Sequence, residues 1–191
     1  MIYLLKDNNF DNLAWQGMEQ ANLKKLFSYL KDNDYRVRTL ASQAIQIKYS
    51  TKKSFHFLIK MLHSFNHIER EIGAYTLGQL GTPKMHFAKE TLPFLYKLLN
   101  DKNEEVLVAT ISAIGHLWSY TSDLENKKII KKIINFTKHK NSDIKISSLI
   151  TLSSIKFNKK IKNIIKNILI QDKNEEVKEW AEVALEILNE K

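Results

Sequence analysis

The chain has 191 residues, a formal net charge of +9 and a globular composition, with 43% hydrophobic and 27% charged residues. It contains no cysteine, which excludes disulfide scaffolds, thiolate zinc sites and cysteine nucleophiles. Five glycines and two prolines are too few for a many-turned β fold, so the composition favours helices. No apolar run approaches the length of a membrane span, and we expect a cytoplasmic protein with no membrane partner.

The first predicted elements are a capping helix and a helical hairpin. Residues 1–21 are expected to form an N-terminal helix that covers the open end of the core. In residues 22–50, Leu26 and Leu30 recur at helical spacing, a polar stretch at 32–34 interrupts them, and the apolar period resumes at Val37. This pattern predicts two helices joined by a short turn.

A duplicated phrase organises the rest of the chain. The hexapeptide Asp-Lys-Asn-Glu-Glu-Val occurs at Asp101–Val106 and again at Asp172–Val177. Weaker copies align at Val37, Glu69, Val106, Ile144 and Val177, with successive spacings of 32, 37, 38 and 33 residues. Such spacing is typical of stacked helical hairpins. We therefore expect five repeats in a single domain, at about 22–50, 51–82, 88–121, 124–157 and 158–190.

Small residues recur at two matched positions of each predicted second helix. One column is Ala41, Gly73, Thr110, Ser148 and Ala181, and the other is Ala44, Thr76, Ala113, Thr151 and Ala184. Small side chains let neighbouring helix axes approach closely, so these columns predict that the second helices stack on one another.

The sequence resembles the HEAT-repeat family over about residues 22–190. Val37-Arg38, followed by Ala41, Ala44 and Ile45, carries the resemblance in the first unit, and Glu69-Arg70 through Gly81 is similar to the HEAT-like repeats of the phycobilin-lyase type. The resemblance implies an all-α, right-handed α-solenoid whose first helices form the convex face and whose second helices line the concave face. It implies no particular activity.

No catalytic, cofactor or metal site is expected. His63 and His67 stand four residues apart, but Asn66-His67 is predicted to be the turn after a first helix, and no further ligand pattern completes a metal site. The acid pairs Glu104-Glu105 and Glu175-Glu176 fall in first helical turns, where the helix dipole favours negative charge. We interpret the protein as a non-enzyme.

Lysine is concentrated in the C-terminal half. Twelve lysines lie between Lys127 and Lys166, with Asp143 as the only acid. Lys127, Lys128, Lys131 and Lys132 alternate with isoleucines, as on the outer face of an amphipathic helix, and Lys159, Lys160, Lys162 and Lys166 repeat the arrangement. This basic patch is either a solvated surface or a site for nucleic acid or an acidic protein. With only three arginines in the chain, base recognition is not favoured.

The predicted inner surface has a different character, because it mixes polar, aromatic and aliphatic side chains as protein-recognition surfaces do. The candidate partner-binding residues are Thr39, Gln43, Glu71, Tyr75, Gln79, Ser112, His116 and Trp118. Ile146, Ile150, Glu179, Val183 and Tyr120 lie at related positions. For Ile146, Ile150 and Val183, packing between repeats is an equally good interpretation.

Two functional hypotheses follow. The preferred one is a scaffold that binds one protein along the concave face, as an inhibitor or immunity protein of a toxin would. The alternative is a nucleic-acid-binding protein, either similar to helical-repeat DNA glycosylases or RNA-binding, that uses the lysine-rich C-terminal half.

Overall fold

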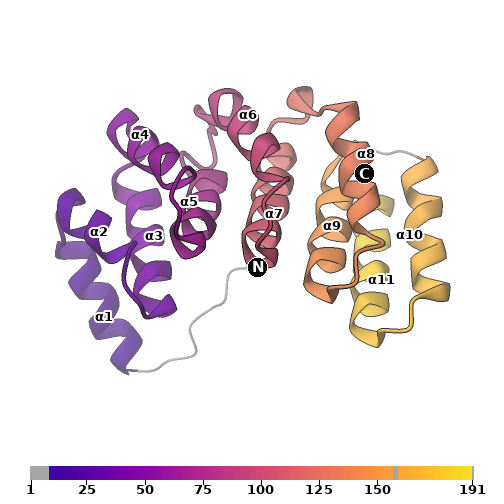
Figure 1. Ribbon diagram of the computed structural model, residues 1–191, viewed down its shortest axis with the longest axis horizontal. Coiled ribbons are helices and arrows are strands. Elements are labelled where there is room, and N and C mark those ends of the chain that lie inside the picture. The colour runs from indigo at the N-terminus through magenta and orange to yellow at the C-terminus, as the bar shows by residue number, and fades with distance from the viewer. Residues whose placement is uncertain (1–8, 157–158, 191) are drawn as a thin grey trace.

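The computed structural model describes residues 9–156 and 159–190, and within these ranges all regular structure is helical (Figure 1). The α-helices are α1 (Asn9–Gln20), α2 (Leu23–Tyr29), α3 (Tyr35–Lys48), α4 (Lys52–Met61), α5 (His67–Gln79), α6 (Ala88–Leu98), α7 (Glu104–Tyr120), α8 (Lys127–Phe136), α9 (Ser142–Ser154), α10 (Lys159–Gln171) and α11 (Glu175–Asn189). A short 3₁₀ helix, η1 (Ser122–Leu124), precedes α8.

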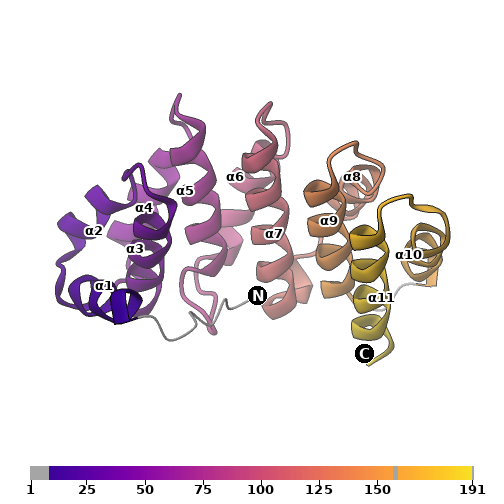
Figure 2. The ribbon, with the colours of Figure 1, turned by 90° about the horizontal axis from the view of Figure 1, so that it is seen from below.

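The helices form an arch of antiparallel pairs. Helix α1 packs on α3 at one end, and the pairs α2/α3, α4/α5, α6/α7, α8/α9 and α10/α11 follow in chain order. The first helix of each pair lies in the convex outer layer, and the second helices α3, α5, α7, α9 and α11 lie side by side along the concave layer (Figures 1 and 2). The predicted all-α solenoid with an N-terminal capping helix is confirmed. Residues 1–8 of the expected cap, and 157 and 158 at the fourth repeat boundary, lie outside the described residues.

One hydrogen-bonding device recurs in the turn within each pair. A side chain in the turn accepts a hydrogen bond from the backbone N–H of the residue two positions later. The distance between the backbone nitrogen and the acceptor atom is 2.9–3.2 Å. That later residue then caps the second helix with its own side chain. The pairs of acceptor and cap are Asp32 and Asp34, Ser64 and Asn66, Asp101 and Asn103, His139 and Asn141, and Asp172 and Asn174. The duplicated hexapeptide is thus one complete copy of this turn, since its Asp begins the turn, its Asn caps the helix and its Val is fully buried.

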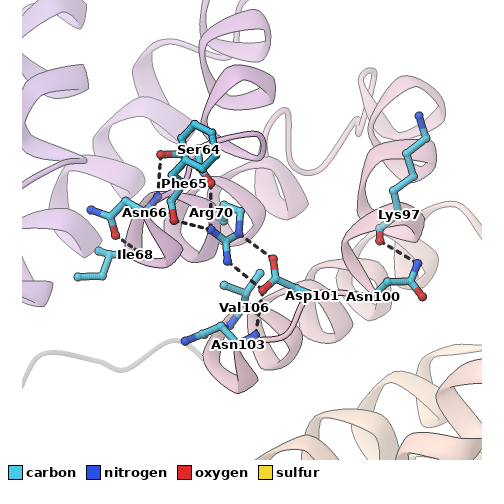
Figure 3. A network of polar contacts seen from close by, with 10 residues as sticks. All are labelled: Ser64, Phe65, Asn66, Ile68, Arg70, Lys97, Asn100, Asp101, Asn103 and Val106. Atoms are coloured by element: carbon cyan, nitrogen blue, oxygen red, sulfur yellow. Dashed lines mark hydrogen bonds and ion pairs between the residues drawn. The ribbon is translucent and has the colours of Figure 1, made fainter.

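Ion pairs link some turns to the preceding repeat. Arg70 of α5 donates to the carbonyl oxygens of Ser64 and Phe65 and also forms a two-pronged contact with Asp101, over 2.7 and 2.9 Å (Figure 3). Lys145 of α9 reaches Asp172 at 2.6 Å in the same way. Where Leu107 replaces the basic residue, His139 replaces the acid of the next turn. The cation and its acid are therefore present or absent together at these three junctions, whereas at the first junction the basic residue is Arg38 and the next turn has Ser64 in place of an acid.

Backbones of successive second helices approach closely at two glycines. A Cβ atom added to Gly78 of α5 would lie 2.5 Å from the Ala113 Cβ of α7, and one added to Gly115 would lie 2.6 Å from the Thr151 Oγ1 of α9. Thr151 Oγ1 also donates across the same junction to the Ile111 carbonyl at 2.9 Å. The predicted small columns supply Ala113 and Thr151, so they do place small residues at the stacking contacts.

The first prediction concerns this close approach. Gly78→Ala should lower the free energy of unfolding by about 1–3 kcal/mol, because the added methyl has no space against α7. Gly17→Ala in α1 is the matched control, since nothing lies within 4 Å of its added Cβ. The control should gain up to about 1 kcal/mol from helix propensity alone. Urea denaturation of both variants measures the difference, and equal effects would contradict the stacking contact.

The second prediction concerns Asp101, whose pKa is held below its usual range mainly by hydrogen bonds from the Arg70 guanidinium, and whose side chain is 8% exposed. A lowered carboxyl pKa stabilises the fold above the unfolded-state value of about 3.9, and this contribution disappears as the pH falls through the folded-state value. Asp101→Asn should therefore cost about 1–3 kcal/mol at pH 7, and the deficit should shrink below about pH 4. Denaturation profiles from pH 3 to 8 measure it. Asp123→Asn, at an exposed position, is the control, and a deficit independent of pH would be the contrary result.

Candidate functional site

The concave face carries three rows of side chains that run across the second helices. Each row takes one residue per helix, and successive rows are four residues apart along each helix, because such residues share a helical face. We call these the inner rows. They consist of Thr39, Glu71, Val108, Ile146 and Glu179; Gln43, Tyr75, Ser112, Ile150 and Val183; and Ile47, Gln79, His116, Ser154 and Ile187.

Most of the predicted partner-binding residues retain accessible surface in these rows. Thr39, Gln43, Glu71, Tyr75, Gln79 and His116 are half-buried, and Ser112 is exposed. Three aliphatic residues were expected either to bind a partner or to pack between repeats. Of these, Ile146 is buried, Ile150 is half-buried and Val183 is 38% exposed. The C-terminal part of the inner rows is therefore more apolar than the N-terminal part, and it is only partly open to a partner.

Trp118 was wrongly predicted to belong to this surface, since its side chain is fully buried. It lies beside Tyr96 of α6, whose hydroxyl donates to the Leu124 carbonyl of η1 at 3.4 Å. Burial raises the pKa of Tyr96, and the neighbouring Trp118 opposes that shift. Tyr120, two residues further on, is the aromatic residue that is exposed at this end of α7.

Glu71 is the electrostatically unusual residue of the inner rows. Burial raises the pKa of its carboxyl, and the nearby Glu105 raises it further, while Arg38 and His67 act in the opposite direction. Arg38 is itself engaged with the carbonyl oxygens of Asp32 and Asn33, both at 2.9 Å. Within residues 9–156 and 159–190, the Glu71 carboxylate forms no hydrogen bond or ion pair. It is a half-buried carboxylate whose pKa stays raised despite the two nearby cationic side chains.

In the third of the inner rows, His116 of α7 forms a small polar cluster. Its Nε2 lies 3.4 Å from the Thr82 hydroxyl, and its ring contacts that of Tyr120 at 5.2 Å between centroids. Burial lowers the pKa of His116, which favours the neutral imidazole. A neutral ring can donate and accept, so this cluster is suited to polar contacts with a partner backbone.

Two residues of this surface were missed by the sequence reasoning. Glu105 reaches the neighbourhood of Glu71 and lies 3.6 Å from His67, although it was interpreted only as a first-turn acid. Ile47, in register with Gln79 and His116, is 71% exposed. For Ile47 the repeat register was the available signal, because it lies one helical turn beyond Gln43, whereas the approach of Glu105 to Glu71 depends on how α5 and α7 pack.

The predicted basic patch lies on α8 and α10 in the outer layer, away from the inner rows (Figure 1). Six of its eight lysines are exposed, whereas Lys132 and Lys162 are half-buried and bond to Asn100 and Asn189. His63 lies in the α4–α5 turn, and His67 is the first residue of α5 and not part of the turn as predicted. The described residues contain no cluster of three potential metal ligands, and no described helix is long and apolar enough to cross a membrane.

Comparison with known proteins agrees with this architecture. Residues 91–121, which span most of α6 and α7, match the family model described as HEAT repeat. The predicted resemblance to HEAT-like repeats is confirmed by this match and by a structural likeness to the CpcE–CpcF complex of phycocyanin lyase from Nostoc sp. PCC7120. That likeness has a TM-score of 0.67 at 17% identity and covers 84% of this chain and 96% of that chain. None of the curated proteins compared with the sequence matches it.

Two other solved structures are similar over nearly the whole chain. YibA of Escherichia coli has a TM-score of 0.82 at 22% identity, covering 99% of this chain and 67% of that chain. A designed armadillo repeat protein in complex with the peptide (KR)4 has a TM-score of 0.59 at 18% identity, covering 95% of this chain and 92% of that chain. At these identities the likeness shows the fold alone, which is a helical-repeat solenoid.

The third prediction follows from the raised pKa of the Glu71 carboxyl. An acid whose pKa is raised by folding destabilises the native state once the pH exceeds its unfolded value of about 4.3. Glu71→Gln should therefore raise the melting temperature slightly at pH 7 and have no stabilising effect at pH 4. Scanning calorimetry at the two pH values measures this, with the exposed Glu179→Gln as the control. A lower melting temperature at pH 7 would show that the carboxylate is already compensated.

Proposed function

We propose that the protein is a non-catalytic scaffold that binds one protein partner along the inner rows. The observation that carries the proposal is the half-buried, unpaired Glu71 beside Tyr75, Gln43 and Gln79 on a continuous helical surface. Folding raises the pKa of this carboxyl and so opposes stability near neutral pH, which makes an external hydrogen-bond donor a better explanation for it than stability.

The chemistry of the rows supports an extended contact. Tyr75 and Ile150 offer partly exposed apolar surface for anchoring, and Gln43, Ser112 and His116 offer hydrogen bonds that fix register. The designed armadillo repeat protein that binds the peptide (KR)4 is a precedent for peptide recognition by a solenoid of similar shape. Inhibition of a single target, such as a toxin whose active site the inner rows cover, is the form of this function that the size and architecture favour.

The fourth prediction tests which face the partner contacts. A photo-crosslinking amino acid is placed at Tyr75 or Ser112 on the inner rows, and at Lys53 on the outer layer as the control. Crosslinking is carried out in the cells that naturally produce the protein, where the product of the neighbouring reading frame is also present. The protein and its adducts are then purified. We expect one stoichiometric adduct from the inner positions and none from Lys53.

Substitutions complete the test. Tyr75→Ala and Glu71→Gln should each weaken capture of that partner by roughly tenfold or more, as anchor residues do, while Lys53→Ala leaves it unchanged. Adducts formed equally from both faces, or capture that is insensitive to both inner substitutions, would exclude the inner rows as the binding surface.

A further inference from the structure

Charge is divided between the two layers of the arch. The first helices carry fifteen lysines and a single acid, Glu90, whereas the second helices carry ten acids and six basic residues. We call the lysines of the first helices the outer lysine surface. They are Lys24, Lys25, Lys52, Lys53, Lys60, Lys89, Lys97, Lys127, Lys128, Lys131, Lys132, Lys159, Lys160, Lys162 and Lys166.

This surface extends well beyond the basic patch visible in the sequence. The fold aligns α2, α4 and α6 with α8 and α10, which adds seven lysines and extends the surface along the whole outer layer (Figure 1). Thirteen of the fifteen side chains are exposed. Among the described residues, no acid forms an ion pair with the lysines of α2, α4, α6 or α8.

Folding does not explain these charges. Nine of the lysines occupy the first turn of their helix, at Lys24, Lys25, Lys52, Lys53, Lys89, Lys127, Lys128, Lys159 and Lys160. A positive charge at a helix N-terminus is disfavoured by the helix dipole, by about 0.3–1 kcal/mol each. Adjacent lysines also repel one another. A local rule that is broken in every first helix is more often a functional feature than a structural one.

We propose that the outer lysine surface binds double-stranded nucleic acid through its phosphates, without selecting a base sequence. Lysine acts as a point charge that neutralises phosphate, and all three arginines of the chain lie on α3 and α5 rather than on the first helices. Phosphate contacts that release counterions carry affinity but no sequence information.

The side chains between the lysines distinguish a duplex from other polyanions. Binding of single strands depends on exposed aromatic rings that stack on bases. The aromatic residues of the first helices are half-buried instead, and Phe27 of α2 stacks on Phe57 of α4 with ring centroids 3.7 Å apart. Ile170 is the only strongly exposed large apolar residue on a described first helix, so the surface also lacks a row of anchors for a lipid bilayer. A duplex, with its bases stacked internally and its phosphates outside, requires neither.

The geometry limits how many lysines act at once. Neighbouring helices are about 8–10 Å apart, and a convex arch touches a straight duplex over only a few of them. The densest part, Lys127 and Lys128 on α8 with Lys159 and Lys160 on α10, is where we expect most contacts. A handful of phosphate contacts corresponds to dissociation constants of about 10⁻⁶–10⁻⁴ M near physiological salt.

The fifth prediction is tested by fluorescence anisotropy with a labelled duplex of mixed sequence at several salt concentrations. In one variant Lys127, Lys128, Lys159 and Lys160 are all changed to Gln. The control variant changes Lys102, Lys138, Lys140 and Lys173 to Gln, four exposed lysines in the turns at the opposite edge, and so removes the same net charge. The first variant should bind at least tenfold more weakly and give a shallower salt dependence, by about one unit of log–log slope for each phosphate that the variant no longer neutralises.

The remaining outcomes are equally decisive. The control variant and Tyr75→Ala should bind the duplex within about twofold of the unmodified protein, and circular dichroism should show both quadruple variants to be folded. Equal weakening of the two quadruple variants would attribute binding to net charge alone and overturn the proposal. Stronger binding to a single strand, or to phosphatidylserine vesicles, than to the duplex would overturn it as well. Because the surface is separate from the inner rows, these results do not depend on the proposed protein partner.

Discussion

Close contact between the backbones of successive second helices is the constraint on which the rest of the structure depends. Gly78 against Ala113 and Gly115 against Thr151 leave no space for a further methyl group. Because each repeat buries its apolar face only against its neighbours, the array has no central core, and these contacts determine how far each second helix lies from the next. The turn acceptors and the ion pairs Arg70–Asp101 and Lys145–Asp172 then hold one edge of the stack in register.

The stacking gives the molecule two surfaces with opposite character. Side chains of the second helices form a mixed inner surface with a half-buried carboxylate at Glu71, and side chains of the first helices form an outer surface of lysines. Neither is a catalytic constellation, and each is a linear array that uses many equivalent positions. We propose that the inner rows bind a protein and that the outer lysine surface binds a nucleic-acid duplex. The two surfaces lie on opposite faces of the arch, so one flat partner cannot contact both.

Much of the fold could be predicted from the sequence, because the same turn, cap and packing signals recur in successive repeats. The hexapeptide revealed the turn, the caps revealed the helix starts, and the small columns revealed the stacking faces. Burial of Trp118 could not be predicted, since its neighbours Tyr96 and Leu124 come from other elements and the residue occupies the end of a helix whose exposure depends on them. The proximity of Glu71 to Glu105 likewise depends on the register between repeats.

The candidate surfaces were predicted less completely than the fold. The dense lysines of α8 and α10 are visible in a sequence window, whereas those of α2, α4 and α6 are thinly spread and become one surface only when the helices are aligned. Exposure along the inner rows also varies with the size of each neighbour. Ile146 is buried although Glu179, at the same repeat position, is exposed, because α11 ends the described array and no later described helix covers it.

One distance measurement tests the central claim, that the inner rows form a single continuous surface, most directly. The chain lacks cysteine, so Thr39→Cys and Glu179→Cys can carry two spin labels at equivalent positions of α3 and α11 without background labelling. Four steps between stacked helices of about 8–10 Å each predict one narrow distribution centred at about 30–40 Å. A broad distribution, or a distance below about 20 Å, would contradict the stacked array.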